Sequence, residues 1–216
     1  MVIKRRKEKR RAAAYKYQQD FRYFARIAEG VKEAGAEELA ELGAQDITLD
    51  FRGIHFRADK ATLYRINYLT RLVSRCLAPL IAFNCNDTDM LYKKAKQVKW
   101  EDFFAKGSTF AVSGNVSDST ISHSKFASLR LKDAVADYFM EKTGKRPDVS
   151  IRNPDILLNL HIRHDKAGIS LDTSGGALHR RGYREETVSA PMQETVAAAI
   201  IRFAKWDGSV SLYDPL

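Results

Sequence analysis

Residues 124–144 read SKFASLRLKDAVADYFMEKTG, and this stretch does most to decide the fold. Ser124 is a suitable N-cap, because its hydroxyl can accept a hydrogen bond from a free amide of the first turn. Gly144 is a suitable end, since glycine readily adopts the left-handed conformation that terminates helices. Between them, small and apolar side chains recur at helical spacing and share one face: Ala127, Leu131, Ala134, Val135 and Tyr138. We therefore expect a long amphipathic helix here.

Three strand patterns follow this helix. They cover residues 149–152, 156–163 and 167–172, and the second alternates apolar with polar side chains. Asp165-Lys166 favours a turn between the last two. A loop at 173–176 ends the region. We place the main domain boundary at Gly175-Gly176, because the sequence then becomes basic and afterwards helical.

The segment before the long helix predicts strand, helix, hairpin, helix, strand, helix and strand, in that order. The expected ranges are 22–27, 31–42, 45–58, 59–77, 80–84, 89–104 and 109–116. Asp59 is a credible N-cap for the second helix, and Pro79 would break it. On that helix Arg71 and Arg75 would lie one turn apart.

The composition excludes several classes of protein. Of the 216 residues, 44% are hydrophobic and 29% charged, so the chain can bury a core and is neither collagen-like, disulfide-stapled nor wholly disordered. Its apolar runs fall far short of the roughly 18 residues of a membrane span. No apolar stretch of the kind found in secretory signals follows the N-terminal bases. We expect a soluble cytoplasmic protein in which Cys76 and Cys85 are reduced, structural thiols.

The net charge of +9 is mostly a property of the first residues. Residues 1–11 hold seven bases and one acid, or +6, which leaves +3 for the rest of the chain. Such a tail can contact phosphate or an anionic surface, and it can equally be a solvated leader.

Two further basic groups are candidate nucleic-acid contacts. Residues 179–184, the basic segment, combine cations with an aromatic ring, which suits phosphate contact with base stacking: His179, Arg180, Arg181, Tyr183 and Arg184. A linker that merely forms salt bridges would look the same. Lys125 and Lys132 are seven residues apart on one exposed helix face, with Arg130 between them. A solvated face is the alternative interpretation.

No motif for catalysis or metal binding is complete in this sequence. His-Glu-x-x-His, Gly-x-Ser-x-Gly, the phosphate-binding Gly-x-x-x-x-Gly-Lys and Gly-x-Gly-x-x-Gly are all absent. His161 and His164 have Asp165 nearby but no further ligand set, so we expect no metal site. We also expect no catalytic residue within these 216 residues.

The last part of the chain reads as the start of another domain. A helix is expected over 193–205, with its apolar face formed by Val196, Ala199, Ile200 and Phe203. A strand is expected over 209–213, and it would point at Asp214-Pro215-Leu216.

Several motifs together resemble a known family. SLRLKDAV (128–135), RPDV (146–149) and NPDI (153–156) resemble the THUMP domain of RNA-modifying enzymes. SLDTSG (170–175), LHRRGYR (178–184) and APMQET (190–195) resemble the junction of bacterial THUMP-containing 23S rRNA guanine-N2 methyltransferases, which genomes often label N6-adenine-specific DNA methylases. The similarity runs from about residue 21 to residue 216.

The resemblance implies an α/β (α+β) chain of several modules. After a basic tail (1–20) it implies a ferredoxin-like module (21–104), a THUMP domain (105–176) and a basic linker (177–192). Residues 193–216 would be the first helix and strand of a class I Rossmann-like methyltransferase domain.

The resemblance also implies the partner and the cofactor. The family binds large-subunit ribosomal RNA and uses S-adenosylmethionine. By analogy Pro191, Glu194 and Thr195 contribute to the cofactor site, and Asp214 and Pro215 begin the cofactor loop Asp-Pro-x-Cys-Gly-Ser-Gly-Thr. The glycines of that loop and the Asn-Pro-Pro-Tyr element that holds the target amine are absent from this sequence.

We therefore expect the RNA-binding portion of such a methyltransferase, truncated at the start of the cofactor motif. Alone it would neither bind S-adenosylmethionine tightly nor transfer methyl groups, because the pocket needs several parallel strands and a glycine-rich turn. The alternative is a stand-alone, non-catalytic adaptor that presents structured RNA to a partner enzyme. A third hypothesis is that the basic tail alone drives binding.

Overall fold

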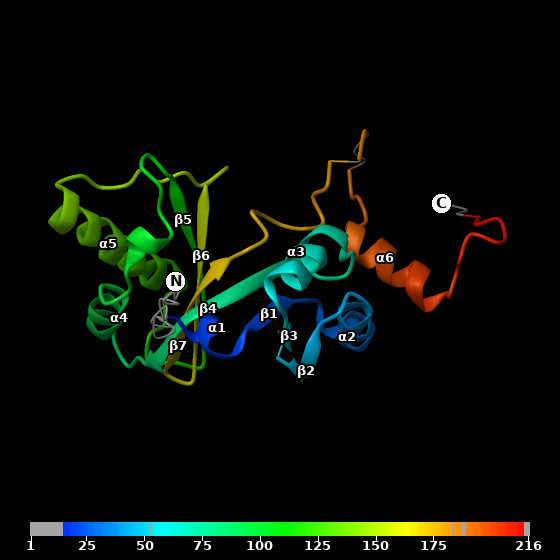
Figure 1. The fold of residues 1–216 in the computed structure, drawn as a ribbon, viewed down its shortest axis with the longest axis horizontal. Coiled ribbons are helices and arrows are strands. Elements are labelled where there is room, and N and C mark those ends of the chain that lie inside the picture. The colour runs from blue at the N-terminus through cyan, green and yellow to red at the C-terminus, as the bar shows by residue number, and fades with distance from the viewer. Residues whose placement is uncertain (1–14, 52, 183, 187–188, 214–216) are drawn as a thin grey trace, which may run out of the picture.

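One seven-stranded sheet connects residues 22–172 in this computed structural model, which describes residues 15–51, 53–182, 184–186 and 189–213. The strand order is β2-β3-β1-β4-β7-β6-β5 (Figure 1). The elements are α1 (Lys16–Asp20), β1 (Arg22–Arg26), α2 (Lys32–Glu41), β2 (Gln45–Asp50), β3 (Gly53–Arg57), α3 (Lys60–Leu69), β4 (Arg75–Asn84), α4 (Thr88–Ala95), β5 (Phe110–Ser117), α5 (Ser124–Thr143), β6 (Ile156–Arg163), β7 (Lys166–Asp172) and α6 (Glu194–Phe203).

The first half of the sheet has the ferredoxin-like arrangement that the resemblance implied. Its elements follow the order β1-α2-β2-β3-α3-β4, and the strands pair antiparallel as β2-β3-β1-β4. Asp59 caps α3 by accepting a hydrogen bond from the Thr62 amide at 2.7 Å, as the sequence predicted.

The second half is built around the long helix α5. β5 and β6 are parallel, and α5 connects them as a crossover helix. β7 pairs antiparallel with β6 on one side and with β4 on the other, so the two halves share one continuous sheet. Gly144 ends α5 with a φ of 71°, which confirms the predicted stop.

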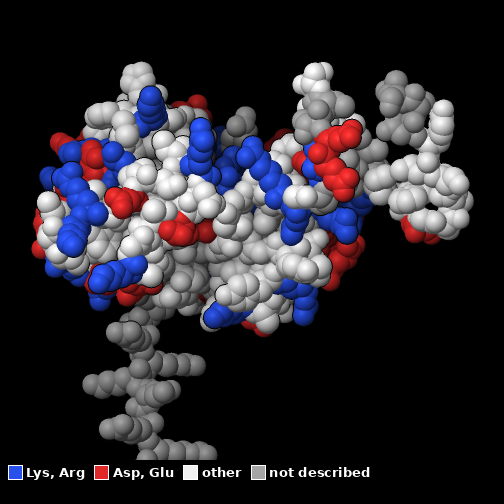
Figure 2. Space-filling model, turned by 90° about the horizontal axis from the view of Figure 1, so that it is seen from above, with Lys and Arg blue, Asp and Glu red and all other residues white. Residues whose placement is uncertain are grey.

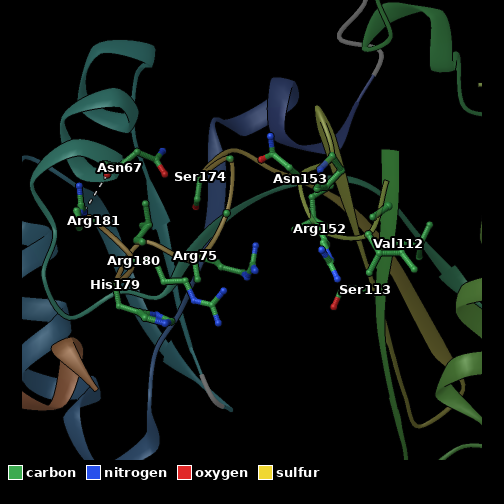
Figure 3. A pocket seen from close by; sticks show the side chains of 18 residues that line it. Asn67, Arg75, Val112, Ser113, Arg152, Asn153, Ser174, His179, Arg180 and Arg181 are labelled. Carbon is green, nitrogen blue, oxygen red and sulfur yellow. Dashed lines mark hydrogen bonds between the residues drawn. The ribbon is translucent and has the colours of Figure 1, made fainter. Parts of the chain in front are cut away.

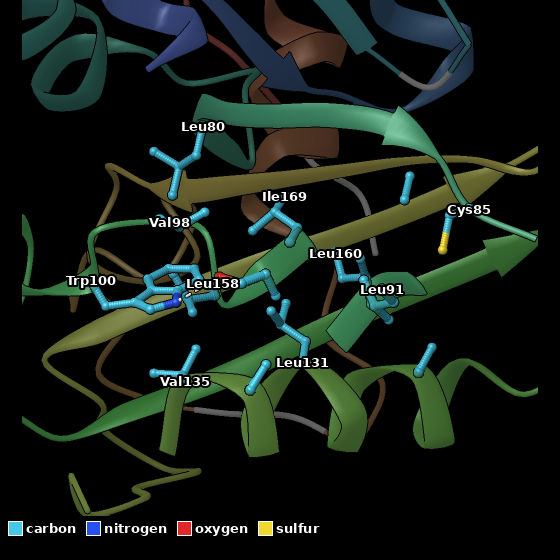
Figure 4. Packing of buried hydrophobic residues seen from close by; sticks show 14 of the residues in the cluster. Leu80, Cys85, Leu91, Val98, Trp100, Leu131, Val135, Leu158, Leu160 and Ile169 are labelled. Carbon is cyan, nitrogen blue, oxygen red and sulfur yellow. Dashed lines mark hydrogen bonds between the residues drawn. The ribbon is translucent and has the colours of Figure 1, made fainter. Parts of the chain in front are cut away.

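Each half has its own apolar core. In the second, Leu131 and Val135 of α5 are fully buried against Leu158 and Leu160 of β6, with Trp100 beside them (Figure 4). The first core gathers buried residues of β1, β3, α2 and α3.

Both cores lie on the same face of the sheet. Leu171 of β7 packs against both cores, and it is the register partner of Ala78 in the first core and of Leu158 in the second. Because paired residues on neighbouring strands point to the same side of a sheet, the helical layers of both halves cover one face. The opposite face carries the intervening, more polar side chains of the strands, among them Asn159 and Ser170.

The predicted helix over 59–77 was wrong in its second half. α3 ends at Leu69 and β4 already begins at Arg75, so Arg71 and Arg75 do not share a helix. The cause is Glu38, a buried carboxylate on α2. It accepts hydrogen bonds from the Thr70 hydroxyl (2.6 Å) and from the amides of Arg71 (2.9 Å) and Leu72 (3.2 Å). These bonds hold the chain in a turn where the local pattern favours continuing the helix.

Pro79, which was expected to break that helix, lies inside β4. The register with β7 shifts between Pro79 and Ile81, and such an irregularity accommodates a residue that cannot donate a ladder hydrogen bond.

Four smaller expectations also need correction. The polar helix over 89–104 ends at Ala95 and is followed by a 3₁₀ turn at Trp100–Asp102. Residues 149–152 form only an isolated bridge, Phe110 with Val149. Residues 209–213 form no strand. The Ser124 hydroxyl accepts from the Val116 amide (2.9 Å) and does not cap α5. The expected helix after residue 193 is confirmed as α6.

Candidate nucleic-acid interface

A cleft of about 910 Å³ lies where β5 and β6 begin and β7 ends. Asn67 and Arg75 line it from the end of α3 and the start of β4. Arg152 and Asn153 line it from the loop before β6, and residues 174–181 line it from the segment after β7. Segments far apart in the sequence therefore build one concave surface (Figure 3).

The cleft is basic. Figure 3 shows the guanidinium groups of Arg75 and Arg180 on one side and that of Arg152 on the other, facing the same space. Arg75 is ion-paired with Asp172, whose side chain is 1% exposed. Arg152 and Arg180 are exposed and form no ion pair within the described part of the chain. Figure 2 shows Lys and Arg side chains gathered near the middle of the molecule, seen from above.

Two buried polar atoms of residues that line the cleft are without a hydrogen-bond partner among the described residues. They are Oδ1 of Asn67 and Nδ1 of His179. The Asn67 amide is held in place by its other end, which donates to the Leu63 carbonyl (3.0 Å) and the Thr173 hydroxyl (3.2 Å). Buried polar groups are nearly always paired, so both atoms are available to a ligand or to water.

The basic segment divides into a structural part and an accessible part. The Arg181 guanidinium donates to the carbonyls of Tyr68 (2.6 Å), Thr70 (2.7 Å) and Asn67 (3.2 Å), and so satisfies free carbonyls at the C-terminal end of α3. Arg184 donates to the Met192 carbonyl (2.6 Å) and lies 3.3 Å from the Glu194 carboxylate. Arg180 has no such partner in the described part, and Tyr183 lies outside the described residues.

The candidate bases on α5 do not join this cleft. Arg130 donates to Asp89 (2.6 Å) and stacks on the Tyr92 ring at 4.4 Å. Lys132 lies 3.6 Å from Asp133, and Lys125 is exposed. The candidate bases that the structure describes thus lie on separate surfaces, some in the cleft and others on α5.

Sequence reasoning missed Arg152 and misplaced Arg75. Arg152 stands directly before the NPDI motif, and this position was the available signal. Arg75 enters the cleft because β4 begins there, which depends on the distant contact made by Glu38.

The residues proposed to contact a cofactor do not build a cofactor pocket by themselves. Thr195 is 7% exposed, Pro191 is exposed, and the Glu194 carboxylate lies against Arg184. Asp214 and Pro215 lie outside the described residues. The described residues hold no group of three His, Cys, Asp or Glu that could bind a metal. No helix in the described part is long and apolar enough to cross a membrane.

Both cysteines are buried and unpaired. Burial raises the pKa of Cys76 to about 12, with the carboxylates of Asp172 and Glu38 adding to the effect. Burial likewise raises the pKa of Cys85 to about 11. Both thiols are therefore protonated at neutral pH, as expected for structural residues.

Three domain families match successive parts of the chain. Residues 22–77 match the RlmL ferredoxin-like domain, residues 85–172 the THUMP domain, and residues 181–216 the RMKL-like methyltransferase domain. β4 contains both the end of the first match and the gap before the second. The module boundary expected at residues 104 and 105 stays a prediction.

Relatives with known names agree with these matches. The ribosomal RNA large subunit methyltransferase K/L of Syntrophotalea carbinolica is 45% identical over 86% of this chain and 26% of its own length. That of Methylococcus capsulatus is 38% identical over 90% of this chain and 27% of its own length. The chain thus spans about a quarter of the length of these two relatives.

Solved structures share the fold. The predicted N6-adenine-specific DNA methylase of Listeria monocytogenes has a TM-score of 0.73 at 28% identity, covering 86% of this chain and 48% of that one. The structure of SMU.472 complexed with SAH has a TM-score of 0.73 at 24% identity, covering 86% and 49%. The chain therefore carries a THUMP domain, preceded by an RlmL ferredoxin-like domain and followed by a match to the RMKL-like methyltransferase domain, and ribosomal RNA large subunit methyltransferases K/L are its homologues.

Proposed function

We propose that this chain is the RNA-binding part of an S-adenosylmethionine-dependent 23S rRNA (guanine-N2)-methyltransferase. One observation carries the proposal: residues from all three matched segments line the basic cleft. Arg75 comes from the ferredoxin-like match, Arg152 from the THUMP match and Arg181 from the methyltransferase match. RNA bound in the cleft would lie against all three segments at once, with Arg181 holding the wall in place and the exposed Arg152 and Arg180 facing the RNA.

The chemistry of the cleft favours a polyanion. Arg152 and Arg180 face a common space, and the carboxylate of Asp172 behind Arg75 is buried and ion-paired with Arg75. Guanidinium groups recognise phosphate oxygens in a bidentate manner, and phosphate contacts supply most of the sequence-independent affinity for RNA. The partner named for the relatives, large-subunit ribosomal RNA, fits such a surface. It also makes a cytoplasmic location the natural expectation.

The cofactor belongs to the proposal for the whole enzyme. The SAH bound to SMU.472 supports S-adenosylmethionine as the methyl donor. Pro191, Glu194 and Thr195 would line one side of its site, once the glycine-rich turn that is absent from these 216 residues is present. We expect no tight binding of S-adenosylmethionine to these 216 residues. Micromolar binding in calorimetry would contradict this.

The RNA proposal is tested by the Arg152→Ala/Arg180→Ala double variant. With a fragment of large-subunit ribosomal RNA, we expect about a ten-fold loss of affinity at low salt, because two phosphate contacts are lost. For the same reason, the slope of the logarithm of affinity against the logarithm of salt concentration should become shallower by about one to two. The control is Lys106→Ala/Lys145→Ala, which removes the same charge from exposed positions outside the cleft. Equal losses for both double variants would refute a specific role for the cleft.

The same measurement separates the rival hypotheses. If the basic tail, which lies outside the described residues, drives all binding, deletion of residues 1–11 abolishes affinity and the cleft variant changes nothing. We expect the deletion to lower affinity at low salt and the cleft effect to persist. RNA binding does not separate a non-catalytic adaptor from a methyltransferase, because both would bind RNA. The two hypotheses differ in whether the protein that carries this chain transfers a methyl group.

A further inference from the structure

A second hollow, of about 320 Å³, lies on the sheet face opposite the helical layers. Residues of all seven strands line it, together with Lys16 of α1 and Phe51 of the turn between β2 and β3. Strand alternation places them there: Tyr23 and Ala25 pack in the core, so Phe24 points to the other face. Leu158 and Leu160 likewise leave Asn159 on that face.

Aromatic rings form two walls of this hollow, which we call the sheet pocket. Phe24 packs edge-on against the His55 ring, with the centroids 4.9 Å apart. Phe51 at the β2–β3 turn is 47% exposed, and the Arg163 guanidinium lies 4.5 Å from its ring centroid. Gly168 of β7 leaves bare backbone in the wall of the pocket, because it has no side chain to fill the space.

Polar side chains converge on the same pocket. Asn159 of β6 is the register partner of Ser170 of β7, and Asn115 of β5 is the partner of His161 of β6. The side chains of Asn115, Asn159 and Ser170 make no hydrogen bond within the described part of the chain. A carboxamide offers a donor and an acceptor side by side, which matches the edge of a nucleobase.

The charges around the pocket favour a ligand that carries negative charge and also has an uncharged part able to form hydrogen bonds. Lys16, Arg26 and Arg163 line it with one carboxylate, that of Asp50, and the Nε atom of Arg163 also lies 3.6 Å from the Asp118 carboxylate. Partial desolvation lowers the pKa of His161, and Arg163 and Arg26 lower it further. The imidazole is therefore neutral at physiological pH and can both donate and accept a hydrogen bond.

We infer that the sheet pocket binds one unstacked base of single-stranded RNA, with Phe51 stacking on the base and Asn159 and Asn115 bonding to its edge. The inference rests on the proposed function and adds a second contact to the cleft. The volume is at the lower end of small-ligand sites, which suits one base and excludes a duplex. Single-stranded loops and bulges are the parts of RNA whose bases proteins read in this way.

The test compares a fluorescein-labelled single-stranded RNA heptamer with a blunt RNA duplex by fluorescence anisotropy. We expect Phe51→Ala to weaken heptamer binding about 5- to 20-fold, as stacked aromatic residues do, and Asn159→Ala to weaken it about 5-fold. Duplex binding should change less than two-fold. The matched controls are Phe126→Ala, an exposed phenylalanine on α5, and Asn84→Ala at the end of β4.

The outcomes separate the two proposals. If both RNAs bind and Phe51→Ala behaves like Phe126→Ala, the sheet pocket is refuted and the proposed function stands. If duplex affinity falls as much as heptamer affinity, the pocket does not select unstacked bases and the inference is wrong. If the unaltered protein binds neither RNA, the proposed function itself fails. A 4-thiouridine heptamer should also crosslink to peptides of the β2–β3 turn and β6, and crosslinks confined to other peptides would overturn the inference.

Discussion

At the scale of single residues, Glu38 has the largest influence on the fold that the sequence does not reveal. It stands next to Leu39 in an acidic stretch of α2, where glutamate is usually solvated. Its carboxylate is nevertheless buried and receives three hydrogen bonds from the turn 70–72. The partners lie more than 30 residues away, so no local pattern could identify the contact.

We predict that Glu38→Ala lowers the free energy of unfolding by about 2–4 kcal/mol, because two amides and a hydroxyl lose a charged acceptor. Urea denaturation followed by circular dichroism measures the change. The control is Glu33→Ala on the same helix, an exposed glutamate whose loss should cost less than about 0.5 kcal/mol. A cost for Glu38→Ala as small as that of the control would show that the turn forms without its acceptor.

At the scale of elements, the basic segment combines two roles that its composition cannot distinguish. A segment with several arginines is compatible with phosphate contact and equally with internal hydrogen bonds and ion pairs. The structure assigns Arg181 and Arg184 to internal bonds, while Arg180 faces the cleft without an internal partner in the described part. The position of the end of α3 decides which arginine bonds internally and which faces the cleft. The predicted end of this helix, residue 77, is eight residues later than the observed end at Leu69.

The two neighbouring arginines should therefore separate stability from binding. Arg181→Ala leaves the last carbonyls of α3 without donors, so we predict a loss of about 1–2 kcal/mol in unfolding free energy and faster hydrogen exchange of the Leu178 amide, which is bonded to Ser74. Arg180→Ala should leave both unchanged and weaken RNA binding. Arg181→Lys should recover little of the unfolding free energy that Arg181→Ala loses, because an ammonium group cannot donate to three carbonyls in the geometry of a guanidinium. Equal stability of Arg180→Ala and Arg181→Ala would contradict this division.

At the scale of the whole molecule, local periodicity predicted most elements but not their connection into one sheet. α5, β6, β7 and the β2–β3 hairpin were evident because their patterns repeat over neighbouring residues. β4 was expected as a short strand over 80–84, whereas it begins at Arg75. Only the full strand reaches from the first core to the second, and its pairing with β7 from Leu77 to Asn84 joins the two.

This shared strand predicts that both halves unfold together, although domain matches divide them. Cys76 lies in the first core and Cys85 in the second, both fully buried, so each thiol reports the opening of its own half. With Cys85→Ala and Cys76→Ala as single-thiol proteins, thiol labelling in urea should give midpoints that coincide with that of circular dichroism for the same variant. Alanine in place of a small buried thiol changes little volume, and any shift in overall stability moves both probes of one variant alike. If Cys76 becomes reactive well below the urea concentration at which its own variant loses its helical signal, the ferredoxin-like half opens independently. The cleft would then lose Arg75 while Arg152 stayed in place, and RNA binding would depend on domain docking instead of on one rigid sheet.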